Sequence, residues 1–196
     1  MLVADLTHYL DLSDDAPGPA RRLAEQLGRI VQAATAGPAG ERWASTVTCT
    51  RRPGNKPCPG TLAVARGSGE DDRIHWQCAA CGDAGTISGW AGSPYDLRRH
   101  TPTPVDATTR PVTVPISTVA VLREVLMLDP AIERAVHAAR AHGPGRAVLQ
   151  LGDDELDELL DAVAAEANHA PDRRTQKQFD TAFHDLDTAA TARGRT

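Results

Sequence analysis

Four cysteines are the residues of this chain whose type and spacing point most directly to chemistry. They are Cys49, Cys58, Cys78 and Cys81, and they fall within one stretch of the 196 residues. The last two form a Cys-x-x-Cys turn, which aims two thiolates at one point, and Gly82 supplies the backbone freedom that this turn needs. Thiolate sulfurs are the usual ligands of tetrahedral zinc in structural sites. The sequence therefore predicts a zinc site with four cysteine ligands.

The first two cysteines are spaced more widely than the last two. The insert between them, residues 50–57, contains a proline–glycine step and a second proline, so the chain can double back and bring both thiolates together. We call this insert the basic loop because it carries three cations, which are Arg51, Arg52 and Lys56. These cations are candidate contacts for phosphate or nucleic acid.

Other uses of the cysteines remain open at this point. Four cysteines allow three disulfide pairings, and buried free thiols are a further alternative. Disulfides belong mainly to secreted proteins, and the first residues lack the basic start and continuous apolar run of a signal peptide because Asp5 interrupts them. No apolar run approaches membrane-spanning length. We therefore expect a cytoplasmic protein with reduced cysteines.

Short strands are predicted around the cysteines. Residues 61–66 and 74–78 have the apolar pattern of strands, turn residues 67–72 separate them, and a third strand is predicted over 86–90. This order of turns, strands and cysteines resembles a zinc-ribbon domain over residues 47–90. The spacing of the first cysteine pair departs from that family, in which Cys-x-x-Cys usually occurs at both ends. The same departure makes iron on a rubredoxin-like site a poorer fit than zinc.

Hydrophobic periodicity and capping residues predict the remaining elements. The expected order is a strand within 2–12, a helix over 20–35, a strand over 112–116, a helix from about 117, a helix capped by Asp129 that runs to about 142, a strand over 147–151, and helices over 155–168 and 172–192. The fold class is therefore α+β, a small antiparallel zinc ribbon flanked by an N-terminal helix and a mainly helical C-terminal part.

These elements divide the chain into four parts. They are an N-terminal strand and helix over residues 1–40, the zinc ribbon over 41–95, a proline-rich linker over 96–111, and the helical part with short strands over 112–196. The segment 159–169, taken with the ribbon, resembles a group of uncharacterised bacterial zinc-ribbon proteins. That resemblance would cover most of the chain and implies no activity.

Several aromatic residues have two interpretations. Trp76 and Trp90 are expected to shield the metal site, because a small ribbon has little other core, and the alternative is a stacking surface for bases. Phe179, Phe183 and Leu186 recur at helical spacing, which indicates either a core face or a groove for a partner.

The composition and the motifs limit which classes of function are plausible. The net charge of −5 argues against a general binder of nucleic acid or anionic membrane. Four cysteine ligands would leave a zinc ion without an open position, and the sequence contains no HExxH motif, phosphate-binding loop or nucleophile elbow, so an enzyme is disfavoured. We expect a non-enzymatic zinc protein with a protein-interaction or scaffold role. The alternative is a nucleic-acid-binding regulator that uses the ribbon; the oligomeric state is not predicted.

Overall fold

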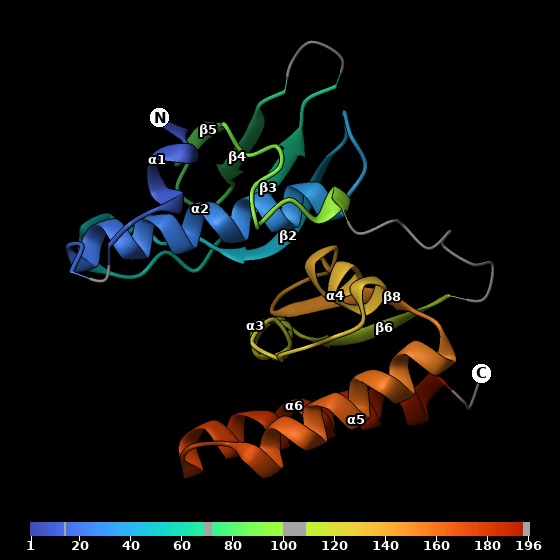
Figure 1. Ribbon diagram of the computed structural model, residues 1–196. Coiled ribbons are helices and arrows are strands. Elements are labelled where there is room, and N and C mark those ends of the chain that lie inside the picture. The colour runs from blue at the N-terminus through green and yellow to red at the C-terminus, as the bar shows by residue number, and fades with distance from the viewer. Residues whose placement is uncertain (14, 69–71, 100–108, 194–196) are drawn as a thin grey trace. The chain divides into compact units, whose positions relative to one another are not determined.

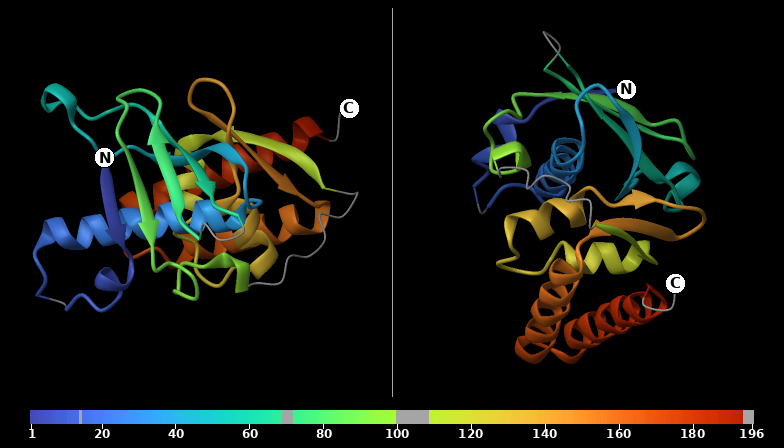
Figure 2. Two further views of the ribbon diagram at one scale, coloured as in Figure 1. Left: turned by 90° about the horizontal axis from the view of Figure 1, so that it is seen from above. Right: turned by 90° about the vertical axis from the view of Figure 1, so that its right-hand side faces the viewer.

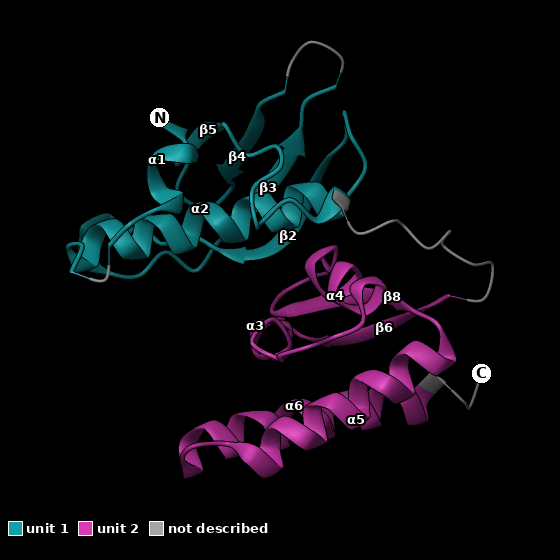
Figure 3. Cartoon of the chain, viewed as in Figure 1, with its two compact units in different colours: residues 1–99 teal, residues 100–196 magenta. Residues whose placement is uncertain are grey.

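The structure of the protein is a computed structural model (Figure 1). The structure describes residues 1–13, 15–68, 72–99 and 109–193. The chain forms two compact units, unit 1 over residues 1–99 and unit 2 over residues 100–196 (Figure 3). Part of the proposed linker, residues 100–108, lies outside the described residues, as do residues 69–71 of the predicted turn.

The described residues of unit 1 form a five-stranded sheet, one long helix and short helical turns. Its elements are β1 (Leu2–Asp5), α1 (Thr7–Leu10), α2 (Gly18–Ala36), β2 (Arg42–Thr48), η1 (Pro53–Asn55), β3 (Thr61–Arg66), β4 (Ile74–Cys78), β5 (Ala84–Ser88) and η2 (Leu97–Arg99). The strand order is β1-β5-β4-β3-β2, in which β1 is parallel to β5 and the other pairs are antiparallel. The helix α2 lies against one face of this sheet (Figure 2).

The core of unit 1 lies between α2 and the sheet. Leu27, Ile30 and Val31 follow the helical period and are fully buried on the inner face of α2. Each such side chain contributes about 1.5–3 kcal/mol when it is fully buried. Gly28 allows close packing on the same helix, because a Cβ at this position would lie 2.6 Å from the ring of Tyr95. The predicted helix over 20–35 is therefore the element that covers the sheet.

The strand β2 is absent from the sequence prediction, and its burial pattern explains why. Ser45 and Thr46 are polar but buried, so the segment does not alternate between apolar and polar residues. Ser45 Oγ donates a hydrogen bond of 2.7 Å to the carbonyl of Leu62, which satisfies the buried hydroxyl. The register between β2 and β3 also shifts between Ala44 and Thr48. Such an irregularity breaks the period of two on which strand prediction depends.

The first twelve residues form a strand and then a single helical turn, where one strand was expected within 2–12. The change occurs at Asp5, whose Oδ1 accepts hydrogen bonds from the Thr7 amide at 3.0 Å and the Thr7 hydroxyl at 2.7 Å. Asp5 precedes the N-cap residue Leu6, and its carboxylate satisfies the amide of Thr7, which has no partner within the helical turn. The strand therefore ends at Asp5, and α1 begins at Thr7.

In the part of unit 2 that the structure describes, a small antiparallel sheet is combined with four helices. Its elements are β6 (Arg110–Pro115), α3 (Ile116–Leu122), α4 (Pro130–His137), β7 (Arg140–Ala141), β8 (Arg146–Leu151), α5 (Asp153–His169) and α6 (Arg173–Arg193). β8 pairs antiparallel with β6 on one side and with β7 on the other. Phe179 and Leu186 of α6 are buried in the core of this unit, whereas Phe183 is 38% exposed.

The helix α4 begins as predicted and ends early. Asp129 Oδ1 accepts a hydrogen bond of 2.8 Å from the Ala131 amide, which confirms the predicted N-cap. The predicted end near residue 142 is wrong, because α4 ends at His137 and Arg140–Ala141 then pair with β8 as β7. Tertiary pairing with β8 thus overrides the local helical pattern.

The chain therefore mixes helices with mostly antiparallel strands. Within the described part of the chain, no helix combines the length and the apolar character needed to cross a membrane.

Candidate metal centre

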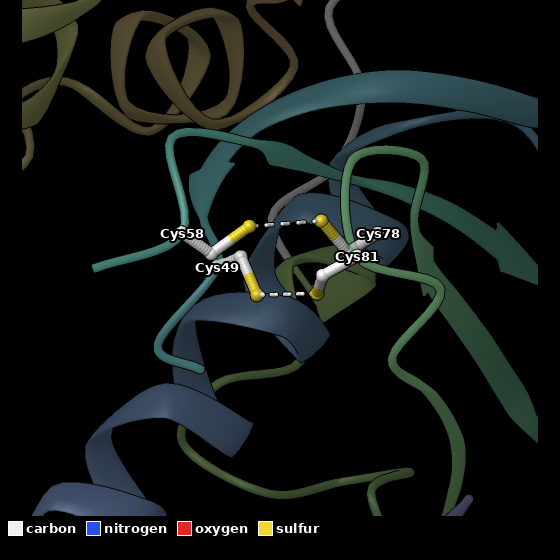
Figure 4. Close-up of side chains that lie close together, drawn as sticks. All are labelled: Cys49, Cys58, Cys78 and Cys81. Atoms are coloured by element: carbon white, nitrogen blue, oxygen red, sulfur yellow. Dashed lines mark hydrogen bonds between the residues drawn. The ribbon is translucent and has the colours of Figure 1, made fainter. Parts of the chain in front are cut away.

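Two separate segments of unit 1 bring the four cysteines together. Cys49 directly follows β2 and Cys58 precedes β3, whereas Cys78 ends β4 and Cys81 lies in the turn before β5. Their side chains point toward one common centre (Figure 4). We call Cys49 and Cys58 the first arm, and Cys78 and Cys81 the second arm.

Sheet pairing fixes the arms against each other. The register between β3 and β4 places Leu62 opposite Cys78. The Cys49 amide donates a hydrogen bond of 2.8 Å to the carbonyl of Gly60, which holds the first cysteine beside the start of β3. The convergence of the sulfurs is therefore a consequence of backbone pairing across unit 1.

The spacing of the four Sγ atoms fits a tetrahedral metal site. All four lie within 4.8 Å of one another. The Sγ atoms of Cys49 and Cys81 are 3.7 Å apart, and so are those of Cys58 and Cys78. A tetrahedron with metal–sulfur bonds of about 2.3 Å has edges of about 3.8 Å. A disulfide would need a separation of about 2.05 Å, and all four thiols are free.

Backbone amides donate hydrogen bonds to the sulfurs of Cys49, Cys58 and Cys78. In each case the donor is the N–H two residues further along: Arg51 for Cys49, Gly60 for Cys58 at 3.5 Å, and Ala80 for Cys78. The amide of Cys81 also donates to Cys78. Such bonds stabilise a thiolate, because the N–H dipole points at the negative sulfur.

Two glycines allow this geometry. A Cβ at Gly60 would lie 2.7 Å from both Cys78 Sγ and Ala80 Cβ, so a side chain here would collide with the second arm. Gly82 has a φ of +72°, the left-handed conformation that the predicted Cys-x-x-Cys-Gly turn requires. The first glycine is needed for space and the second for its backbone conformation.

The protonation of the thiols depends on burial and on these amides. Burial raises the pKa of Cys49 to about 12. The Gly60 amide acts to lower the pKa of Cys58, but burial and the neighbouring Cys78 thiol outweigh it, so this pKa is also raised. Burial acts to raise the pKa of Cys78, but the amides of Cys81 and Ala80 outweigh it and lower this pKa. A cation must therefore displace protons when it binds, and its affinity rises with pH.

The donor set fits a borderline or soft metal ion. Four sulfurs suit zinc and iron, whereas calcium and magnesium require oxygen ligands. Four protein ligands would also complete a tetrahedral coordination sphere, which is the arrangement of structural sites. Within the described part of the chain, this is the only group of three or more cysteine, histidine or acidic residues close enough to hold a metal.

The tryptophans of unit 1 belong to the core that surrounds the site. Trp43, Trp76 and Trp90 are all at least 94% buried and share one hydrophobic cluster with three of the cysteines. Trp90 Nε1 also donates to the carbonyl of Asp72. Buried rings cannot stack on nucleic-acid bases, so the shielding interpretation of Trp76 and Trp90 fits the structure.

The basic loop is exposed and folds back on itself as expected. The Cys58 amide donates a hydrogen bond of 2.9 Å to the carbonyl of Arg51, which closes the loop at its base. Gly54 and Asn55 both have positive φ values, +58° and +63°, and they form the reversal at the tip. All three cations are exposed, although Arg51 lies 3.7 Å from the carboxylate of Asp83.

The acidic start of α5 has a structural explanation. Glu155 Oε2 accepts a hydrogen bond of 2.7 Å from the Gly152 amide, so this carboxylate caps the helix. The His169 ring is hydrogen-bonded through Nδ1 to the carbonyl of Ala165. Neither residue belongs to a metal-binding group among the described residues.

No family model, curated protein or solved structure matches the chain. No known relative therefore supports the resemblance to zinc ribbons or to a bacterial group. The metal centre is inferred from the geometry of the four sulfurs.

Proposed function

We propose that this is a non-enzymatic zinc-binding protein in which a four-cysteine zinc ribbon, residues 41–95, is stabilised by the metal. The observation that carries the proposal is the arrangement of the four free Sγ atoms, all within 4.8 Å of one another and with two separations of 3.7 Å. Zinc is preferred because it binds four thiolates without redox chemistry and tolerates small departures from ideal angles. Reduced thiols also suit a cytoplasmic location.

The role of the metal in this proposal is structural. The site joins two arms that lie twenty residues apart in the sequence, from Cys58 to Cys78, and on different strands. Zinc binding energy is then folding energy, because the unfolded chain does not hold the four sulfurs together. Four protein ligands leave no position for a substrate or a reactive water, which argues against catalysis at this site.

The biological task that we propose is a contact with another protein. Support comes from exposed apolar side chains in unit 2, where Met127 is fully exposed and Leu126 is 72% exposed. Exposed carboxylates also line α5, and they favour a basic partner; they are Asp153, Asp154, Asp157, Glu158 and Asp161. Of the three apolar residues predicted to recur along α6, which are Phe179, Phe183 and Leu186, Phe183 is the exposed one and is the residue to mutate first.

The alternative function is a nucleic-acid-binding regulator. The exposure of Arg51, Arg52 and Lys56 favours it, because these three cations could contact phosphates. Three cations neutralise about three phosphates, which gives weak and salt-dependent binding. The buried tryptophans offer no stacking surface, and the net charge of −5 opposes it.

Metal analysis tests the proposal directly. Purified protein should contain about one zinc per chain, and zinc removal by a chelator should increase hydrogen exchange in residues 41–95. Cys81→Ser should have the same effect, because it removes one of the four ligands. Ala79→Ser is the matched control, since it adds a hydroxyl to an exposed position in the same turn and keeps all four sulfurs.

The possible results separate clearly. Protein without bound metal, or protein whose four cysteines form two disulfides, would refute the zinc centre. Unchanged hydrogen exchange after zinc removal would refute its structural role.

A further inference from the structure

We propose that the four-cysteine site is also an oxidative modification site, in which peroxide joins Cys49 to Cys81 as a disulfide and releases the metal. This inference rests on the proposed zinc centre and adds a means of regulating it. It depends on two observations: the separation of 3.7 Å between the sulfurs of Cys49 and Cys81, which belong to different arms, and the accessibility of Cys81.

Two sulfur separations of 3.7 Å run between the arms, and all four sulfurs lie within 4.8 Å of one another. Cys49 lies 3.7 Å from Cys81, and Cys58 lies 3.7 Å from Cys78, as the two dashed lines of Figure 4 show. A disulfide in either pair requires the sulfurs to approach by about 1.7 Å, to the bonded distance of about 2.05 Å. Rotation of the side chains can supply much of this approach while the sheet keeps its register. The fold thus holds two pairs of sulfurs close enough for disulfide formation, Cys49 with Cys81 and Cys58 with Cys78.

Cys81 is the sulfur at which oxidation should begin. It is partly exposed, whereas the other three cysteines are buried. Of the four sulfurs, that of Cys81 is therefore the one that peroxide reaches most readily.

The reaction balances with one equivalent of hydrogen peroxide. The thiolate of Cys81 attacks one peroxide oxygen, the O–O bond breaks, and the leaving hydroxide takes up a proton to give water. Cys81 is then a sulfenic acid. The thiolate of Cys49 attacks the Cys81 sulfur, the S–S bond forms, the S–O bond breaks, and the second hydroxide is protonated to water. The two sulfurs lose two electrons in total, and peroxide gains them.

Disulfide formation removes two of the four metal ligands. Cys58 and Cys78 alone cannot complete a tetrahedral site, so the zinc ion dissociates. The new bond connects the end of β2 to the turn between β4 and β5, so the two arms stay joined. The more buried Cys58–Cys78 pair should react only with a second equivalent of peroxide. The site would then respond to oxidant in two stages, and a thiol reductant with added zinc should reverse both.

The test uses the full chain loaded with zinc. Hydrogen peroxide is added in steps, released zinc is followed with a chromogenic chelator, and remaining thiols are blocked with N-ethylmaleimide. Trypsin then cleaves after Arg51 and Arg66, which separates Cys49, Cys58 and the second arm; it does not cleave before Pro53 or Pro57, so Cys58 stays in one peptide. The expected peptides are 43–51 with Cys49, 52–66 with Cys58, and 74–98 with the second arm.

Each disulfide has a distinct signature in mass spectrometry. We expect the first equivalent of peroxide to link peptide 43–51 to peptide 74–98, with fragmentation across Ala79–Ala80 placing the link on Cys81. Zinc release should rise in parallel with this linked species. An internal disulfide between Cys78 and Cys81, a link from 43–51 to 52–66, or zinc-loaded protein that resists peroxide would each overturn the proposal.

Variants separate this proposal from the zinc centre itself. In Cys49→Ser the resolving thiol is gone, so oxidised Cys81 should accumulate as a sulfenic acid that dimedone traps, whereas Ala79→Ser should behave as the wild type. If Cys49→Ser does not fold, the peptide map of the wild type still decides. Protein that never binds zinc would refute the proposed function, whereas protein that binds zinc and forms a different first disulfide would refute only this inference.

Discussion

Gly60→Ala offers a sharp test of the metal centre, because it perturbs the site without removing a ligand. Gly60 lies two residues after Cys58, and its amide donates to the Cys58 sulfur. A Cβ at this position would lie 2.7 Å from Cys78 Sγ and 2.7 Å from Ala80 Cβ. One added methyl group therefore pushes the first arm away from the second.

The size of the effect follows from that contact. Ordinary van der Waals contact begins at 3.4 Å, so the Cys78 sulfur or the backbone of Gly60 must move by about 0.7 Å. Metal–ligand distances tolerate changes of only about 0.2 Å. Changes next to the ligands of a metal typically weaken its binding by about 10- to 100-fold, which corresponds to about 1.4–2.8 kcal/mol. We expect a loss of zinc affinity in this range.

Competition with a chromogenic chelator measures the affinity, and the absorption spectrum of the cobalt(II) form reports whether four thiolates still bind in a tetrahedron. Gly54→Ala is the matched control in the basic loop. Gly54 has a φ of +58°, but a Cβ there would have no atom of the described residues within 4 Å. Gly54→Ala should lower the free energy of unfolding by about 1 kcal/mol, because alanine disfavours the left-handed backbone conformation, and it should leave the four sulfurs in place. Equal zinc affinity in Gly60→Ala and the wild type would refute the geometry described here.

Three further predictions concern pH, capping and charge. Burial lowers the pKa of His137 to about 3, and the positive charge of Arg123 acts in the same direction. The unfolded chain binds this proton near pH 6.5, so the contribution to stability is complete above pH 6.5 and is lost as the pH falls toward 3, by about 3 kcal/mol at pH 4.5. Urea unfolding should show this loss in the wild type and a flatter profile in His137→Gln; equal slopes would contradict the assignment. Asp129→Ala should lower the free energy of unfolding by about 1 kcal/mol because it removes the cap of α4, and urea unfolding at pH 7 showing no change would contradict this. Replacement of the three basic-loop cations by alanine should leave the zinc content unchanged, and fluorescence anisotropy should show negligible binding of generic duplex DNA by either protein at physiological salt. Submicromolar binding by the wild type that disappears in this variant would favour the nucleic-acid alternative.

The sequence was sufficient to identify the cysteines that cluster, because ligand type and the Cys-x-x-Cys-Gly turn are local features. The turn in the structure has the positive φ at Gly82 that the glycine implied. The strands over 61–66 and 74–78 also have the predicted bounds. These segments alternate in burial and are bounded by turns, so local pattern and tertiary structure agree.

Other elements depend on partners that are distant in the sequence. β2 contains the buried polar residues Ser45 and Thr46. The hydroxyl of Ser45 is satisfied by a hydrogen bond to the Leu62 carbonyl, and the register of β2 against β3 is shifted. β7 has only two residues, and it exists because β8 supplies its pairing partner. A single-sequence pattern contains neither partner, so these strands could not be predicted from it.

The pairing of the sulfurs illustrates the same limit at the candidate site. Spacing alone groups Cys78 with Cys81, because they are three residues apart and form one turn. In the structure the short contacts join Cys49 to Cys81 and Cys58 to Cys78. This pairing follows from the register that sets Leu62 opposite Cys78 and from the hydrogen bond between the Cys49 amide and the Gly60 carbonyl. The cysteines that cluster can thus be identified from the sequence, whereas the two cross-arm separations of 3.7 Å depend on how the sheet pairs.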